Sequence, residues 1–109
     1  MMKLTIIESP YAGDTFANTE YARVCLLNSL NRGEAPMASH LLYTQVLDDT
    51  NHADRDRGIS AGHERLRRAD LVAVYVDKGI SQGMLQGILA AQYENIEIEY
   101  RRLYEPQEA

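Results

Sequence analysis

Residues 70–77, DLVAVYVD, are the stretch that decides the fold of this 109-residue chain. Between the two aspartates every residue is apolar or aromatic, so neither face of an extended segment would be polar. Strands of this kind are typical of the centre of a parallel sheet, where helices cover both faces. The stretch therefore predicts a central parallel strand with helices on both sides of it.

Three other segments have the pattern of strands. Residues 3–8, KLTIIE, form a short apolar run with β-branched side chains. Residues 35–42, APMASHLL, are mostly apolar, and their proline lies near the start, where the missing N–H matters least. Residues 96–100, IEIEY, alternate apolar and charged side chains, as an edge strand does.

Three helices are expected between these strands. Asn18 is predicted to cap the first helix, with Glu20 in its first turn and Gly33 just past its end. The second is predicted over residues 53–69, and Ser81 is predicted to cap the third. The side chains of the third helix that we expect to face inward are Met84, Leu85, Ile88 and Ala91.

The resulting order is β-α-β-α-β-α-β, which predicts an α/β fold with a parallel sheet and right-handed crossovers. A chain of 109 residues supports one hydrophobic core rather than two. We therefore expect a single domain over residues 1–104, with residues 105–109 as a frayed tail.

Composition narrows the class of protein. The net charge of −5 argues against a nucleic-acid partner, since such proteins usually carry a basic face. No apolar run is long enough to span a membrane, and the first residues lack the pattern of a signal peptide. The single cysteine, Cys25, lies among apolar residues, which favours a buried thiol and a cytoplasmic protein. No His, Cys or carboxylate set has metal-ligand spacing, so we expect neither a metal nor a cofactor.

Two loops are the strongest candidates for a binding site. In parallel α/β sheets, ligands bind beyond the carboxyl ends of the strands. Residues 9–14, SPYAGD, follow the first strand, and residues 77–83, DKGISQG, follow the central one. We expect these two strands to be neighbours, so that each loop forms half of one site.

The first loop carries groups suited to a nucleoside. Tyr11 offers a flat face and a hydroxyl, and Gly13 permits a close backbone approach. Asp14 offers a carboxylate that either binds sugar hydroxyls or caps the following helix. The alternative to a binding site is a turn with a packed tyrosine and a capping aspartate.

The second loop suits an anion. Gly79 and Gly83 flank Ser81, which leaves backbone N–H groups accessible at the start of a helix. Asp77 ends the central strand, where a buried carboxylate is costly without a partner. A simple turn and cap is the alternative interpretation of this loop.

Two further features could belong to the site. His40 and Tyr43 follow the second strand, and His40 is either a hydrogen-bonded structural residue or a general base. Gly58 and Gly62 lie on the expected second helix, where each glycine costs about 1 kcal/mol relative to alanine. Close packing against a helix or subunit, or room for a ligand, would compensate. The candidate ligand-binding residues are therefore Ser9, Tyr11, Gly13, Asp14, His40, Tyr43, Asp77, Gly79, Ser81, Gly83 and Met84.

Three motifs together resemble a known family. SPYAGD at 9–14, HLLYTQVLDD at 40–49 and GISQGMLQGI at 79–88 are similar to the nucleoside 2-deoxyribosyltransferase-like superfamily, and more closely to a small branch common in phages and prophages. The resemblance spans nearly the whole chain. It implies a flavodoxin-like sheet, an oligomer, and sugar or base contacts from Tyr11, Gly13, Asp14 and Asp77.

The sequence departs from that superfamily at the catalytic position. The enzymes use a glutamate on the last major helix to attack the sugar, and the resemblance places it near position 87. Gln86 and Gly87 stand there instead, and neither forms a glycosyl ester. Glu64 or Asp48 would substitute only if the fold brought one of them to the cleft.

The sequence therefore favours a binding protein over a transferase. The leading expectation is a small homo-oligomer that binds a nucleoside or nucleotide derivative, in the cytoplasm of a bacterial host if a phage encodes it. It would sequester a nucleotide-derived immune signal, of the cyclic nucleotide or ADP-ribose type, as an anti-defence protein. The alternatives are a deoxyribosyltransferase or N-glycoside hydrolase with a relocated carboxylate, and an oligomeric interaction protein without a ligand.

Overall fold

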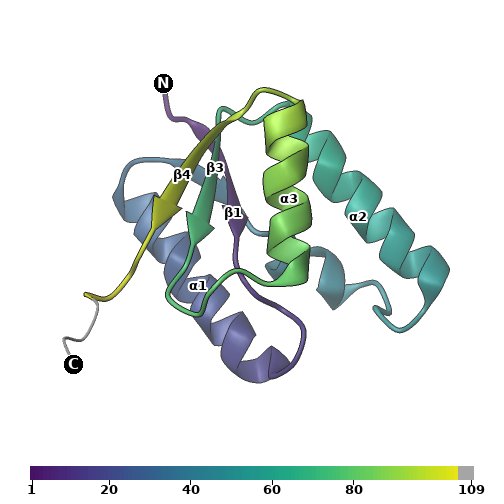
Figure 1. The fold of residues 1–109 in the computed structure, drawn as a ribbon. Helices are drawn as coiled ribbons and strands as arrows, with labels where there is room; N and C mark the ends of the chain where they lie inside the picture. Colours follow the sequence, from purple (N-terminus) through teal and green to yellow (C-terminus); the bar gives the residue numbers. More distant parts are fainter. Residues whose placement is uncertain (106–109) are drawn as a thin grey trace.

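The strands form one parallel sheet in the order β2-β1-β3-β4 (Figure 1). The computed structural model describes residues 1–105. Its strands are β1 (Leu4–Glu8), β2 (Ala35–Met37), β3 (Leu71–Tyr75) and β4 (Glu97–Arg101). Its helices are α1 (Thr15–Asn31), α2 (His52–Arg67) and α3 (Gln82–Tyr93), with two short 3₁₀ helices, η1 (Ser39–Leu41) and η2 (Tyr43–Gln45). The topology is flavodoxin-like, so the predicted order of elements and the predicted α/β fold are confirmed. Residues 106–109, which make up most of the predicted frayed tail, lie outside the described residues.

The central strand is β3, as its sequence predicts. All five of its residues are buried, and it pairs with β1 on one side and β4 on the other. Val72 and Val74 pack with residues of α2 and α3, while Ala73 and Tyr75 pack with residues of α1. The fully buried Cys25 belongs to the α1 side, which confirms its predicted burial.

The same alternation orients β1. Ile6 packs in the core between the sheet and the α2 and α3 helices, and Ile7 packs in the core on the α1 side. Side chains two apart on a strand share a face. Glu8, the last residue of β1, therefore points to the side of α2 and α3, as Ile6 does.

The first helix begins earlier than predicted. Asp14 is its N-cap, because its carboxylate accepts a hydrogen bond from the backbone N–H of Ala17 at 3.1 Å. The predicted cap, Asn18, is instead buried inside the helix, where its side-chain amide donates to the carbonyls of Tyr11 and Ala12. The prediction of Asn18 as the cap was wrong, since a carboxylate one turn earlier already satisfies the free N–H groups. The predicted end before Gly33, whose φ is +83°, is confirmed.

The second strand is shorter than predicted. Of the predicted strand at 35–42, only Ala35–Met37 pairs with β1. Residues 39–41 form the 3₁₀ helix η1, and residues 43–45, just past the predicted strand, form η2. This strand lies at the edge of the sheet, so it has one neighbour to extend along. The chain leaves that neighbour after Met37 and turns back toward α2.

The third helix is capped as predicted. The Ser81 hydroxyl accepts a hydrogen bond from the Met84 backbone N–H at 3.2 Å. Met84, Ile88 and Ala91 are buried, but Leu85 is 42% exposed, so the inward orientation predicted for Leu85 was wrong. It follows Met84 directly, and a step of about 100° around a helix turns its side chain away from the sheet.

Candidate functional site

A cavity of about 340 Å³ lies at the carboxyl end of β1 and β2, on the side of the sheet that α2 and α3 cover. Three stretches of chain wall it: the end of β1 with the loop that follows, the segment between β2 and α2, and the first turns of α3. One face of α2 closes the remaining side. The cavity thus lies where parallel α/β sheets usually bind ligands, and its volume is within the usual range for small-molecule sites.

Five of the candidate residues line this cavity, and six do not. Those that line it are Tyr11, His40, Tyr43, Ser81 and Gly83. Those outside it are Ser9, Gly13, Asp14, Asp77, Gly79 and Met84. The strands that precede the two predicted loops are neighbours, as expected. However, only the later part of the second loop reaches the cavity.

Tyr11 and His40 form one wall of the cavity. Their rings are stacked, with centroids 4.7 Å apart and planes inclined by 13°. Burial lowers the pKa of the His40 imidazole, and Asp49 opposes that shift only in part. A neutral imidazole against a phenol ring gives a flat, uncharged surface of the kind on which an aromatic ligand stacks.

The start of α3 forms the opposite part of the lining. Ser81, Gln82 and Gly83 all border the cavity, and no atom lies within 4 Å of the place where a Gly83 side chain would begin. Met84 N–H donates to the Ser81 hydroxyl, but the N–H groups before it in the first turn have no partner within the helix and favour negative charge. An anionic group of a ligand therefore has a favourable place at this end.

The sequence did not point to Glu8, which the structure places in the cavity wall. Its carboxyl lies against the backbone of Gly87: a Cβ built on that glycine would be 2.5 Å from Glu8 Oε2 and 2.8 Å from Oε1. Glu8 therefore occupies the space that a side chain at position 87 would need. The alternation of side chains along the strand could have indicated this position, because it puts Glu8 on the same side of the sheet as Ile6.

The environment of Glu8 favours its uncharged form. Burial raises the pKa of the Glu8 carboxyl from 4.5 to about 8. Neither a hydrogen-bond donor nor a cation within residues 1–105 offsets this effect of burial. A carboxyl that keeps its proton at neutral pH both donates and accepts a hydrogen bond.

Asp77 does not line the cavity, and its carboxylate forms hydrogen bonds within the fold. Its carboxylate accepts hydrogen bonds from the Tyr21 hydroxyl at 2.6 Å and from the backbone N–H groups of Leu103 and Tyr104. Burial opposes ionisation of Asp77, but these hydrogen bonds outweigh it and keep its pKa below the usual value. The carboxylate thereby ties the end of β3 to α1 and to the segment after β4.

The other residues outside the cavity have roles in the fold. Asp14 caps α1, and Gly79 has a φ of +83°, which L side chains rarely adopt. Ser9 and Met84 are 2% and 1% exposed, so both are packed inside the protein. Their predicted contacts with a ligand stay predictions.

Glu64 and Asp48, the carboxylates that might have replaced the family glutamate, do not border the cavity. Glu64 is exposed on α2 and forms ion pairs with Arg67 and Arg68. Asp48 accepts hydrogen bonds from the backbone and hydroxyl of Thr50. Neither carboxylate lies where Glu8 does.

The two glycines of α2 both border the cavity. Gly58 would bring a side chain within 3.4 Å of Leu47 Cδ1, and Gly62 has open space around it. A side chain at either position would therefore narrow the cavity. Neither glycine packs tightly against another helix of the described chain, so a subunit contact and room for a ligand stay as the predicted reasons for them.

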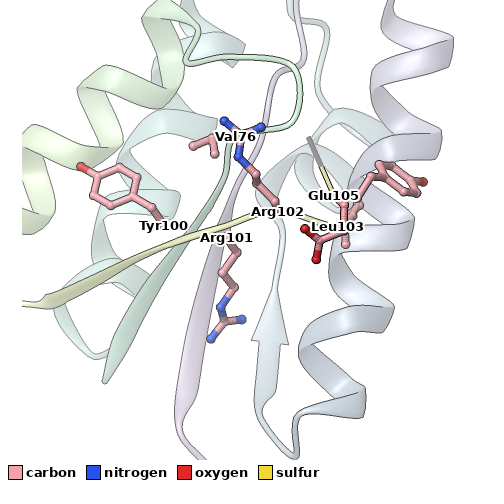
Figure 2. Close-up of a pocket in the computed structure, with 7 residues that line it drawn as sticks. Val76, Tyr100, Arg101, Arg102, Leu103 and Glu105 are labelled. Carbon is pink, nitrogen blue, oxygen red and sulfur yellow. The ribbon is translucent and has the colours of Figure 1, made fainter. Parts of the chain in front are cut away.

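A second hollow, of about 460 Å³, lies at the end of β4 (Figure 2). Val76 and the single segment 100–105 line it. Figure 2 shows the Arg101 and Arg102 side chains leaving the strand in opposite directions. Arg101 is buried and bound to Glu34 at 2.6 Å, so it belongs to the fold rather than to a ligand site. We therefore place the candidate site in the cavity at β1 and β2.

Residues 1–105 show neither a metal-binding cluster nor a membrane-spanning helix. No group of three or more His, Cys, Asp or Glu side chains there is arranged to hold a metal ion. None of the helices in that range is both long and apolar enough to cross a membrane.

Comparison with known protein families gives one match. The model of a domain of unknown function, DUF7768, matches residues 3–101. The chain belongs to this family. The match runs from just before β1 to the last residue of β4, so the DUF7768 domain includes the whole sheet and the entire lining of the cavity. A search of the curated proteins found no match.

Proposed function

We propose that this DUF7768 domain binds a nucleoside or nucleotide-derived small molecule in the cavity at the carboxyl end of β1 and β2. The observation that carries the proposal is that all three motif segments, around residues 9–14, 40–49 and 79–88, contribute to one cavity. Segments that the fold gathers in this way supply a flat aromatic wall, hydrogen-bonding groups and a helix start.

Each part of such a ligand has a suitable neighbour. The Tyr11 and His40 rings suit stacking with a base. The start of α3 and the guanidinium of Arg55, which also borders the cavity, suit a phosphate. Asp49 is a further carboxylate in the lining and suits sugar hydroxyls.

The finer identity of the family is part of the same proposal. The motifs resemble the nucleoside 2-deoxyribosyltransferase-like superfamily and its phage-associated branch. On that basis the domain would sequester a nucleotide-derived immune signal, of the cyclic nucleotide or ADP-ribose type. The absence of a carboxylate at positions 86 and 87 supports binding without the superfamily's usual transfer reaction.

Calorimetry and thermal shift with nucleosides, nucleoside monophosphates, cyclic nucleotides and ADP-ribose test the proposal. At least one compound should raise the melting temperature, and Tyr11→Ala should weaken its binding at least about fivefold, because a stacked base contributes about 1–3 kcal/mol. Tyr93→Ala is the matched control, since Tyr93 is 85% exposed on α3 and is not part of the cavity. Binding that responds equally to both substitutions, or no binding at all, would count against the proposal.

A second candidate function is cleavage of an N-glycosidic bond, and the position of Glu8 favours it. Its carboxyl lies over Gly87, the place where the resemblance puts the catalytic glutamate. In such a reaction the Glu8 carboxyl first loses the proton that its burial favours, and the resulting carboxylate forms a bond to the anomeric carbon while the bond to the base nitrogen breaks. The base leaves with the electron pair and takes up a proton, and water then hydrolyses the glycosyl ester.

This candidate has a test of its own. Deoxynucleosides incubated with the protein should release free base, measured by chromatography, and Glu8→Gln should abolish the release. The double variant Glu8→Ala with Gly87→Glu, which returns the carboxylate to the helix, should restore part of it. If the unmodified protein releases no base, the domain is a binding protein.

A third candidate, an interaction protein without a ligand, has apolar surface in its favour. The outer face of α1 exposes Phe16, Val24, Leu27 and Leu30, from 43% to 78% each. Surfaces of this kind often mark contacts between proteins. Assembly of several copies is compatible with the binding function, and the resemblance implies it.

A further inference from the structure

Glu8 is the one carboxyl group in the cavity wall that ends a strand of the sheet. It is the last residue of β1, and its partner in the register is Val74 of the central strand. Its side chain lies between the sheet and α3, with its carboxyl against Gly87. The end of the strand thus places a carboxyl in the cavity wall.

Gly87 provides the space in which this carboxyl lies. Even the first side-chain atom of a larger residue would come within 2.5 Å of Glu8 Oε2 and 2.6 Å of its Cδ. Gly87 is buried within α3, where glycine lowers helix stability by about 1 kcal/mol relative to alanine. Glycine at position 87 thus leaves room for the Glu8 carboxyl, although it lowers the stability of α3.

Burial alone shifts the pKa of the Glu8 carboxyl, and neither a hydrogen bond nor a nearby charge from residues 1–105 contributes to that shift. No side-chain oxygen in that range is both fully enclosed and unpaired, so the oxygens of Glu8 remain accessible from the cavity. Because it borders the cavity, its free hydrogen-bonding capacity is directed at whatever fills that space.

We infer that the carboxyl of Glu8 recognises the base of the ligand. It would form two hydrogen bonds with a ring edge that presents a donor beside an acceptor. A carboxylic acid has one donor and one acceptor on adjacent atoms, which matches the amide or amidine edge of a nucleobase. A sugar or a phosphate has no such flat edge. This inference rests on the proposed function and adds the part of the ligand that Glu8 recognises.

The charged and titratable groups around Glu8 come from each wall of the cavity. Tyr11 lies on the loop after β1, and α3 contributes none in its lining from Ser81 to Gly87. The remaining groups are on the β2–α2 segment and on α2: His40, Tyr43, Asp49, Asp54, Arg55 and His63. Burial keeps the proton on Glu8 up to about pH 8, so the acid form is available at neutral pH.

Calorimetry with paired nucleosides tests the inference. The pairs are adenosine with N6,N6-dimethyladenosine, cytidine with N4,N4-dimethylcytidine, and uridine with 3-methyluridine. In each pair the second compound has lost the donor hydrogen of the base edge. The unmodified protein should bind at least one parent nucleoside at least about fivefold more tightly than its methylated partner, because an unpaired buried group costs about 1–3 kcal/mol. Glu8→Ala should lose this preference.

Glu8→Gln separates the acid from the carboxylate. An amide also donates and accepts, so this variant should keep the preference at pH 7. Above about pH 8 the affinity of the unmodified protein for the parent nucleoside that it binds should fall, by up to about tenfold per pH unit, while that of Glu8→Gln stays level. A pH dependence that persists in Glu8→Gln would assign the effect to another cavity group and overturn the inference.

The remaining outcomes distinguish this inference from the proposed function. Binding of a parent nucleoside with no preference over its methylated partner, or a preference that Glu8→Ala retains, would overturn the role of Glu8 and leave nucleoside binding intact. Failure of the unmodified protein to bind any of the six compounds would overturn the role of Glu8, and the proposed function would fall with it only if the nucleotides and ADP-ribose of the earlier panel also failed to bind.

Discussion

The Glu8 carboxyl fills the space above Gly87. A side chain at position 87 would place its Cβ only 2.5 Å from Glu8 Oε2. The end of a strand thus supplies the carboxyl at the place where the resemblance puts a helix glutamate. Either residue changed alone would disturb the other, and the two should therefore behave as a coupled pair.

Stability measurements should reveal this coupling. In the unmodified protein, Gly87→Ala should bring no gain or a loss, because the new Cβ meets the Glu8 carboxyl. In a Glu8→Ala background the same change should raise the free energy of unfolding by about 1 kcal/mol, which is the usual preference of a helix for alanine. Urea denaturation of the four proteins gives the interaction energy.

Gly62→Ala is the matched control for that cycle. Gly62 also lies on a helix and borders the cavity, but no atom lies within 4 Å of its built Cβ. It should stabilise the protein by about 1 kcal/mol in both backgrounds. Equal effects of Gly87→Ala with and without Glu8 would contradict the coupling.

Stability should also depend on pH through Glu8. Its pKa is about 8 in the folded protein and 4.5 in the unfolded reference, so the folded state holds the proton more tightly. Stability from this group is fully present below pH 4.5 and declines as pH rises to about 8, by up to about 1.4 kcal/mol per pH unit. Glu8→Gln removes the titration, so its advantage over the unmodified protein should grow across that window. Denaturation at about pH 5 and about pH 8 measures it, and a constant difference would show that Glu8 titrates normally.

Asp77 and Tyr11 should respond in opposite ways to substitution. Asp77→Asn removes the charge and replaces one of the two oxygens that accept from Tyr21, Leu103 and Tyr104 by a donor, and it should cost about 1.5–3 kcal/mol of stability. Nucleoside affinity should change little, because Asp77 does not border the cavity. Tyr11→Ala should weaken binding and leave the melting temperature nearly unchanged. Tyr21→Phe, which removes one donor to Asp77, is the control and should have a smaller effect on stability.

The oligomeric state should depend on α1. We expect light scattering to give a dimer or larger assembly, and Leu27→Lys to shift it toward the 12.3 kDa monomer. Leu89→Lys on α3 is matched to it, since Leu27 and Leu89 are 56% and 55% exposed. A monomer for the unmodified protein at micromolar concentration would refute the expectation. Dissociation by Leu89→Lys alone would place the contact on α3.

The arrangement of strands and helices could be predicted from local patterns. The uninterrupted apolar run at 71–76 is buried only if helices cover both faces of its strand, and this requirement places the strand at the centre of the sheet. Ser81 shows its role as a cap because a hydroxyl before a helix finds its N–H partner within one turn. Asn18 failed as a cap because Asp14, one turn earlier, meets the same requirement first.

The members of the site were harder to predict. Tyr11, His40 and Ser81 were predicted because each follows or precedes a recognisable element at the ligand-binding edge of the sheet. Asp77 was expected there too, but its side chain meets Tyr21 and the segment after β4, which lie far from it in sequence. A carboxylate takes whichever donors the fold brings close, and a loop pattern does not reveal them.

By itself the sequence determined a parallel α/β fold and its central strand, and it predicted the edge at which a ligand would lie. These properties follow from patterns repeated every two residues in strands and every 3.6 in helices, so neighbouring residues suffice to show them. Only the tertiary structure decided that Glu8 meets Gly87 and that Asp77 turns away from the cavity. The reason is that both arrangements depend on side chains that meet across different elements, where burial and the nearest partner, rather than local pattern, set position and charge.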